Sequence, residues 1–199
     1  MLRLVETIRS EDGILKNLSH HNERLNRSVG DLFGKRPGLS LEEIVKVPVN
    51  ASSGIFKCRV EYDFLVRKIE FIEYEARIIR SLKMIEDNSI DYSYKYTDRK
   101  RIEELFLRRE GCDEILIIKN GMVTDSSYAN IILRDQRGRW ITPDSYLLAG
   151  TRRANLLQKG LITERRVTYK DIEKYSEVKL INAMLDINDS EAIPISGIL

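Results

Sequence analysis

The sequence predicts an α+β protein made of two small lobes, with mixed and antiparallel sheets and flanking helices. Two runs, residues 55–62 and 69–77, alternate apolar with polar residues, as half-buried antiparallel strands do. Residues 18–33 carry apolar side chains at helical spacing. Between residues 86 and 93 the periodicity is lost and Asp, Asn and Ser accumulate, which is typical of a connecting segment. We therefore expect an N-terminal lobe of residues 1–88 and a C-terminal lobe of residues 89–199.

The first lobe is predicted to begin with a strand and a tight turn. Residues 2–8 form the strand, and Asp12-Gly13 is a hairpin turn into Ile14-Leu15. A helix follows over residues 18–33 and ends near Gly34. Residues 40–43, Ser-Leu-Glu-Glu, match a capping box, so we expect a short helix that Pro48 ends.

The second lobe is predicted to be richer in strands. Asp98 is placed to cap a helix that runs to about Glu110. Asn120-Gly121 and Arg137-Gly138 are hairpin turns, and Gly160 ends a helix. The remaining predicted elements are strands 114–119, 122–124, 129–133, 139–142 and 178–185 and the helix 152–159.

Composition excludes several functional classes. The 199 residues are 42% hydrophobic and 32% charged, which is typical of a soluble globular protein, and the net charge of +2 is too small for a dedicated nucleic-acid binder. No apolar run approaches the roughly 20 residues that a membrane-spanning helix needs. Acidic and basic residues occur too early for a secretory signal, so we expect a cytoplasmic protein.

The sequence offers no metal site. Cys58 and Cys112 are isolated, so they indicate neither a disulfide framework nor a zinc site. His20 and His21 have no cysteine nearby and no further histidine in the chain. We expect no bound metal.

One stretch of the second lobe combines several features of a cofactor site. Gly121-Met-Val-Thr-Asp125-Ser-Ser-Tyr-Ala-Asn130-Ile131 joins a hairpin, a lone acid and a polar loop, and Leu147-Leu-Ala-Gly150-Thr151-Arg-Arg153 adds a Gly-Thr helix start. In this order the segments resemble the cofactor cradle of the fold-type IV pyridoxal-phosphate enzymes. That family comprises the class IV aminotransferases and the aminodeoxychorismate lyases.

The resemblance implies a two-lobe D-amino acid aminotransferase-like fold that binds pyridoxal 5'-phosphate. Such a site needs a lysine to bond the cofactor, an acid beside its ring nitrogen, and an anion cradle. Lys95, in a Lys-x-x-x-Arg segment similar to that of the lyase branch, is the candidate lysine; otherwise it is a solvated surface residue. Asp125 stands where the family usually has glutamate and would face the ring nitrogen; the alternative is an Asx turn.

The anion cradle is assigned to three segments by the same resemblance. Gly150, Thr151 and Arg152 match the family's Gly-Ile-Thr-Arg segment only partly, so backbone N–H groups would hold the phosphate; the alternative is an ordinary helix start. Asn182 and Ala183 stand where the family has another phosphate-contacting loop. Arg24 matches the arginine of the first-lobe helix, which can bind phosphate bidentately.

The first residues of this chain correspond to a later part of the family's usual sequence. Relatives usually have a β-hairpin before the strand that here contains residues 6–9, and this chain lacks it, so substrate choice is the least determined property. The chemistry implied is aminodeoxychorismate lyase-like, giving 4-aminobenzoate and pyruvate. The alternatives are branched-chain or D-amino acid transamination, and a non-catalytic relative that binds a phosphorylated small molecule. The expected partners are an amino-acid-like substrate and a second copy of the chain, with no nucleic acid or membrane.

Overall fold

The computed structural model describes residues 2–35 and 38–199, and the chain divides into two compact units. The first unit consists of Met1–Ala76 and Tyr94–Asp98, and the second of Arg77–Ser93 and Arg99–Leu199. The boundary predicted between residues 88 and 89 lies inside the segment Arg77–Ser93 of the second unit. The α+β fold class is confirmed, with helices and several sheets in the same chain.

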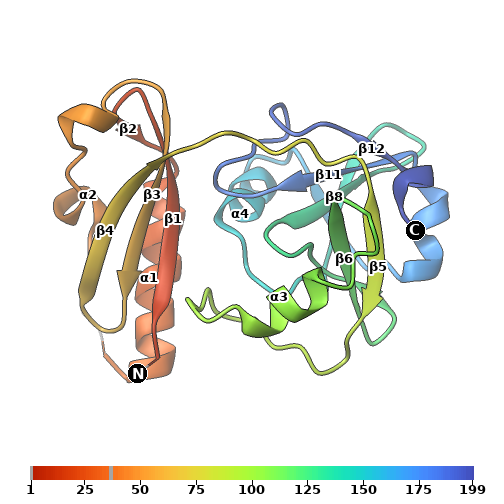
Figure 1. The fold of residues 1–199 in the computed structure, drawn as a ribbon, viewed down its shortest axis with the longest axis horizontal. Coiled ribbons are helices and arrows are strands. Elements are labelled where there is room, and N and C mark those ends of the chain that lie inside the picture. The colour runs from red at the N-terminus through yellow and green to blue at the C-terminus, as the bar shows by residue number, and fades with distance from the viewer. Residues whose placement is uncertain (1, 36–37) are drawn as a thin grey trace. The chain divides into compact units, whose positions relative to one another are not determined.

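The first unit is a four-stranded antiparallel sheet with the order β2-β1-β3-β4. Its strands are β1 (Leu4–Glu11), β2 (Ile14–Leu15), β3 (Ile55–Tyr62) and β4 (Val66–Glu73). Helix α1 (Leu18–Phe33) lies along one face of this sheet (Figure 1) and has the predicted bounds. Its apolar side chains bury the alternating residues of the strands, in a core that includes Leu4, Ile8, Leu25, Val29, Cys58 and Val60.

The capping box predicted in the first unit is wrong. Helix α2 (Leu41–Ile44) begins after Ser40, but Ser40 Oγ donates to Glu42 Oε2 at 3.1 Å and makes no cap bond to the helix backbone. The helix ends at Ile44, and Pro48 instead precedes the 3-10 turn η1 (Val49–Ala51). Strand β4 also begins three residues earlier and ends four residues earlier than predicted.

The second unit contains two sheets. The smaller has the order β5-β6-β7, with β5 (Leu82–Glu86), β6 (Glu114–Lys119) and β7 (Met122–Val123). The larger has the order β10-β9-β8-β11-β12, with β8 (Asn130–Arg134), β9 (Trp140–Pro143), β10 (Thr163–Arg165), β11 (Glu177–Ile181) and β12 (Ile193–Pro194). The helical segments are α3 (Lys100–Phe106), α4 (Thr151–Gln158), η2 (Tyr169–Lys174) and η3 (Ile195–Gly197).

Several predicted boundaries in the second unit are corrected. Helix α3 begins at Lys100 with Arg99 at its N-cap, so Asp98 is not the capping residue. Strand β11 ends at Ile181, because the next residue, Asn182, begins a turn in which its Oδ1 accepts from two backbone N–H groups. Strands β5 and β10, which the sequence patterns did not predict, each pair in parallel with one neighbour.

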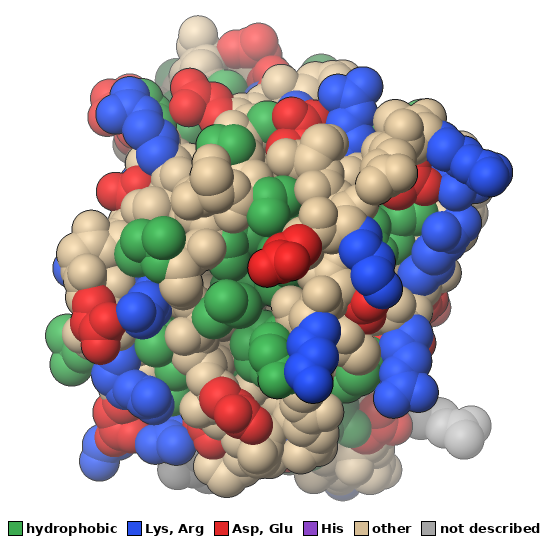
Figure 2. Space-filling view, turned by 90° about the vertical axis from the view of Figure 1, so that its right-hand side faces the viewer, with side chains coloured by type: hydrophobic (Ala, Val, Ile, Leu, Met, Phe, Trp, Pro, Cys, Tyr) green, Lys and Arg blue, Asp and Glu red, His purple; other side chains and the backbone are tan. Residues whose placement is uncertain are grey.

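The surface carries charges of both signs. Figure 2 shows Lys and Arg, Asp and Glu, and hydrophobic side chains interspersed on one face. Exposed arginines form ion pairs, including Arg101 with Glu104 and with the buried Asp87, and Arg134 with Glu177. Over the described part of the chain, no helix has the length and apolar character needed to span a bilayer.

Candidate functional site

Asp125 is a buried carboxylate at the end of a hairpin in the second unit. It follows β7 and forms an isolated bridge with Asn130, so that a tight turn separates these two residues. Its Oδ1 accepts from Asn130 Nδ2 at 2.8 Å, and its Oδ2 accepts from the N–H groups of Leu147 and Leu148 at 3.1 and 2.9 Å. Burial raises the pKa of Asp125 to about 6, although these hydrogen bonds favour the charged form.

Asn130 connects Asp125 to the start of helix α4. Its Nδ2 donates to Asp125 Oδ1 and also to the Leu148 carbonyl oxygen, which lies 2.9 Å away. A Cβ placed on Gly150, the N-cap residue of α4, would lie 1.9 Å from Asn130 Oδ1. Only glycine can therefore occupy position 150 while Asn130 keeps its bonds. The acid and the helix start are parts of one packed arrangement.

The first turn of α4 carries two arginines. It contains no acidic residue, and Gly150 has no side chain with which to cap it. Arg152 is largely buried and its Nη1 pairs with Asp186 Oδ2 at 3.2 Å. Arg153 is buried against strand β9, where it donates to Thr142 Oγ1 and the Pro143 carbonyl at 3.2 and 3.0 Å. Arg153 Nη2 also pairs with Glu164 Oε1 at 3.0 Å. Because both arginines are paired with carboxylates, it is the helix dipole and the backbone N–H groups that make this end of α4 favourable for an anion.

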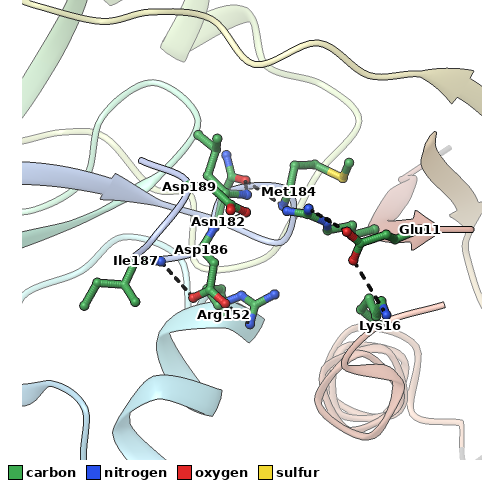
Figure 3. A network of polar contacts seen from close by, with 10 residues as sticks. Glu11, Lys16, Arg152, Asn182, Met184, Asp186, Ile187 and Asp189 are labelled. Carbon is green, nitrogen blue, oxygen red and sulfur yellow. Dashed lines mark hydrogen bonds and ion pairs between the residues drawn. The ribbon is translucent and has the colours of Figure 1, made fainter. Parts of the chain in front are cut away.

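Asn182 and Ala183 lie in the turn after β11, which Figure 3 shows with Asp186 and Arg152. Asn182 Oδ1 accepts from the N–H groups of Met184 and Leu185 at 2.8 and 3.0 Å, and the Asn182 N–H donates to the Leu185 carbonyl. Asp186 Oδ1 accepts from the Ile187 N–H at 2.7 Å (Figure 3). The side-chain oxygen and the N–H of Asn182 are thus committed to the turn itself.

Arg24 belongs to a buried polar cluster in the first unit. Its Nε donates to Glu6 Oε1 at 2.9 Å and its Nη2 pairs with Glu6 Oε2 at 2.5 Å. His21 Nδ1 is 2.6 Å from the same Oε2. Burial acts to raise the pKa of Glu6, but the charge of Arg24 and the bond to His21 outweigh it and lower the pKa to about 2. The bidentate pair fixes the orientation of the Arg24 guanidinium.

Lys95 also lies in the first unit, in a segment added to the edge of β1. The Lys95 carbonyl accepts from the Val5 N–H at 2.9 Å, and Tyr96 forms an isolated bridge with Leu4. The side chain is partly buried. Its charge acts on the same cluster, because it adds to burial and to Arg24 in lowering the pKa of His21.

The structure therefore groups the predicted residues by unit. Lys95 and Arg24 belong to the first unit with Glu6 and His21, while Asp125, Gly150, Thr151, Arg152, Asn182 and Ala183 belong to the second. The sequence reasoning missed the roles of Glu6 and Asn130. Asn130 stood in the quoted motif, but only its bonds to Asp125 and Leu148 reveal what it does.

Comparison with known proteins places these features in a family. A sequence model of a family described as Amino-transferase class IV matches residues 45–193. An uncharacterized protein of Haemophilus influenzae is 40% identical over 186 residues, covering 92% of this chain and 98% of the relative.

The chain is also similar to proteins of solved structure. A protein of Haemophilus somnus, described as a candidate 4-amino-4-deoxychorismate lyase, superposes with a TM-score of 0.86 and 35% identity, covering 94% of this chain and 98% of that one. The branched-chain amino acid aminotransferase of Escherichia coli shares the fold, with a TM-score of 0.72, 15% identity and coverage of 99% and 76% of the two chains.

Proposed function

The chain belongs to the amino-transferase class IV family, and from this premise we propose that it performs aminodeoxychorismate lyase chemistry with Lys95 as the catalytic residue. It is a pyridoxal-phosphate-dependent enzyme of fold type IV. The proposed reaction eliminates pyruvate from 4-amino-4-deoxychorismate and leaves 4-aminobenzoate. The Haemophilus somnus relative, at 35% identity over nearly the whole chain, supports this reaction over transamination.

One observation carries the proposal, namely that Asn130 joins Asp125 to the Gly150 end of α4. The cofactor has a basic ring nitrogen at one side and a phosphate at another, and it needs a carboxylate and an anion cradle held at a fixed spacing. The backbone N–H groups at the start of α4 suit the phosphate, and the buried carboxylate suits the ring nitrogen. The residues present thus fit pyridoxal phosphate.

Each residue then has a defined task. When bound, pyridoxal phosphate supplies a protonated ring that takes up electrons from the substrate. Asp125 holds the proton at the ring nitrogen, and the backbone N–H groups at Gly150, Thr151 and Arg152 bind the phosphate. Because the Asn182 N–H is committed to the turn, the second phosphate contact is assigned to the backbone at Ala183.

The first unit supplies the remaining groups. Lys95 would hold the cofactor through Nζ, and once the substrate amine has displaced it, the free Nζ amine would accept the proton from Cα of the substrate. Arg24 binds the phosphate through the guanidinium edge that Glu6 does not occupy. We also propose that the protein acts in the cytoplasm as a homodimer; light scattering that gave the mass of one chain, 23.1 kDa, would contradict the dimer.

The deciding experiment is to add pyridoxal phosphate to the protein, reduce with borohydride, and map the labelled peptide. We expect a yellow protein with the label on Lys95, and Lys95→Ala is expected to lose both the colour and all release of pyruvate. Lys46→Ala is the matched control, because Lys46 is exposed in the same unit. Label scattered over surface lysines would contradict the catalytic assignment and favour a protein that only binds a phosphorylated small molecule.

Pyruvate and 4-aminobenzoate are then measured with 4-amino-4-deoxychorismate as substrate. Release of both in equal amounts is expected. Amino-group transfer from a branched-chain or D-amino acid to a keto acid, without any 4-aminobenzoate, would replace the lyase reaction by transamination.

A further inference from the structure

The turn that presents Asp125 is held at the peptide groups of Ser127 by two charged side chains. Glu114, the first residue of β6, accepts from the Ser127 N–H through Oε1 at 3.2 Å. Arg99, the N-cap residue of α3, donates from Nη2 to the Ser127 carbonyl at 2.7 Å. Bonds from charged side chains are about twice as strong as neutral ones, so both sides of this residue are firmly fixed.

Glu114 is an unusual residue to place in this position. It is fully buried, and burial raises the pKa of its carboxyl group. Its Oε1 also accepts from the Ile115 N–H, whereas its Oε2 is buried without a hydrogen bond from any described residue, with Arg77 Nη2 at 3.6 Å. A buried carboxylate with an unsatisfied oxygen costs stability, which core packing alone does not explain.

The neighbouring residue is held as well. The Arg77 guanidinium lies over the Tyr128 ring, 4.6 Å from its centroid, and the Tyr128 carbonyl accepts from Asn182 Nδ2 at 3.4 Å. Ser126 Oγ closes the turn by accepting from the N–H groups of Tyr128 and Ala129. Residues 126–129 therefore have little freedom, and Asp125 and Asn130 stand at the two ends of this fixed turn.

Arg99 gives this arrangement a link to the candidate catalytic segment. It follows Lys95 by four residues and is the arginine of the Lys-x-x-x-Arg pattern. The structure shows what that arginine contacts, namely the Ser127 carbonyl two residues beyond Asp125.

We propose that Glu114 and Arg99 are positioning residues that hold the Ser127 peptide groups and thereby keep the Asp125 carboxylate in place for the ring nitrogen of the cofactor. This inference rests on the proposed function for its last step only. Glu114 and Arg99 restrict the motion of this turn whether or not the cofactor is bound, so their effect on the turn is measured in the cofactor-free protein.

The first measurement is amide hydrogen exchange of residues 124–131 in the cofactor-free protein. Glu114→Ala and Arg99→Ala are expected to speed exchange in this segment by about tenfold or more, which corresponds to about 1.4 kcal/mol of local stability. Glu114→Gln keeps an acceptor oxygen and is expected to restore most of the protection. Glu104→Ala and Arg108→Ala, both exposed on or just after α3, are the matched controls and should leave exchange unchanged.

The second measurement is the dissociation constant of pyridoxal phosphate in a double-mutant cycle with Asp125→Asn. If the two residues act through Asp125, Glu114→Ala alone weakens binding about tenfold but adds less than about twofold to Asp125→Asn. Full additivity, or unchanged exchange in the first measurement, would overturn the proposal. Should Glu114→Ala fail to fold, Arg99→Ala tests the other side of the same peptide.

These outcomes separate the two claims. A wild-type protein that takes up no label on Lys95 refutes the proposed function, while the exchange measurement still decides whether Glu114 and Arg99 hold the turn. Normal labelling of Lys95 with additive effects in the cycle refutes the positioning role alone.

Discussion

At the scale of single residues, two buried carboxyl groups, Glu6 in the first unit and Asp125 in the second, have opposite electrostatic properties. Glu6 is paired with Arg24 and His21, and its pKa is lowered to about 2. The hydrogen bonds to Asp125 from Asn130, Leu147 and Leu148 come from neutral groups, and burial outweighs them and the charge of Arg153 and raises its pKa to about 6. The two groups therefore contribute to stability with opposite dependence on pH.

Asp125 is expected to make the cofactor-free protein less stable as pH rises. Because its pKa is higher in the folded state than the usual 3.8, the folded protein binds this proton more tightly, and the free energy of unfolding falls between about pH 4 and pH 6. Relative to Asp125→Asn, wild type should lose on the order of 2–3 kcal/mol across this window, measured by denaturant unfolding. Asp135→Asn is the control with the opposite sign, because hydrogen bonds, first the one from the Arg139 N–H, lower the pKa of that carboxyl group. If the difference in the free energy of unfolding between wild type and Asp125→Asn did not change with pH, the raised pKa of Asp125 would be contradicted.

Glu6→Gln is expected to destabilise the first unit strongly. It removes the carboxylate that faces the buried Arg24, and breaking a buried ion pair by removing one charge typically costs about 3–5 kcal/mol. The loss should be present above about pH 4.5 and disappear as pH falls toward 2, since wild type then loses the same charge. Glu61→Gln, on the more exposed face of the same sheet, is the matched control and should change the free energy of unfolding by less than about 0.5 kcal/mol.

At the scale of elements, the start of helix α4 depends on a single missing atom. A Cβ on residue 150 would meet Asn130 Oδ1 at 1.9 Å and force that amide away from Asp125. Gly150→Ala is therefore expected to lower the free energy of unfolding by about 2 kcal/mol or more and to weaken pyridoxal phosphate binding, measured by thermal unfolding and titration.

Gly30→Ala is the matched control, because Gly30 lies inside α1, where a Cβ has room. That change should stabilise the protein by about 0.5–1 kcal/mol. Equal effects at both positions would show that Asn130 is not held against Gly150.

The elements that the sequence predicted are those specified by local physics. Helix α1 has a long apolar stripe and a left-handed Gly34 after it, and the hairpin turns contain Asp12-Gly13 and Asn120-Gly121 with positive φ. The patterns did not predict β5 and β10, because a short parallel edge strand is specified by its partner and not by its own sequence. The capping box at Ser40 failed because its hydroxyl found a nearby carboxylate instead of the helix backbone.

In the candidate site, too, the features specified by local sequence could be predicted and those that depend on distant partners could not. The positions of Asp125 and Gly150 could be proposed from their motif, because both are tied to turns that the sequence specifies. The roles of Asn130, Glu114 and Glu6 could not, since each depends on a partner at least five residues away along the chain. Lys95, Arg24 and the phosphate-binding assignments stay predictions that the labelling and binding experiments test.

At the scale of the whole molecule, the chain passes between its two compact units three times. The first unit takes residues up to Ala76, the second takes Arg77–Ser93, the first takes back Tyr94–Asp98, and the second takes the rest. The returning segment contains Lys95. It is bonded to β1 through Val5 and Lys95, and to the residue before β1 through Arg3 and Thr97.

This interleaving has a consequence for protein engineering and for evolution by recombination. A single cut cannot release either unit intact, since expressing residues 77–199 alone would leave the lysine segment without the strand that orders it. A chimera that exchanges one unit between relatives needs three junctions, near residues 76, 93 and 98. Shuffling at one crossover would separate Lys95 from its supporting strand, so we expect these two units to be inherited together.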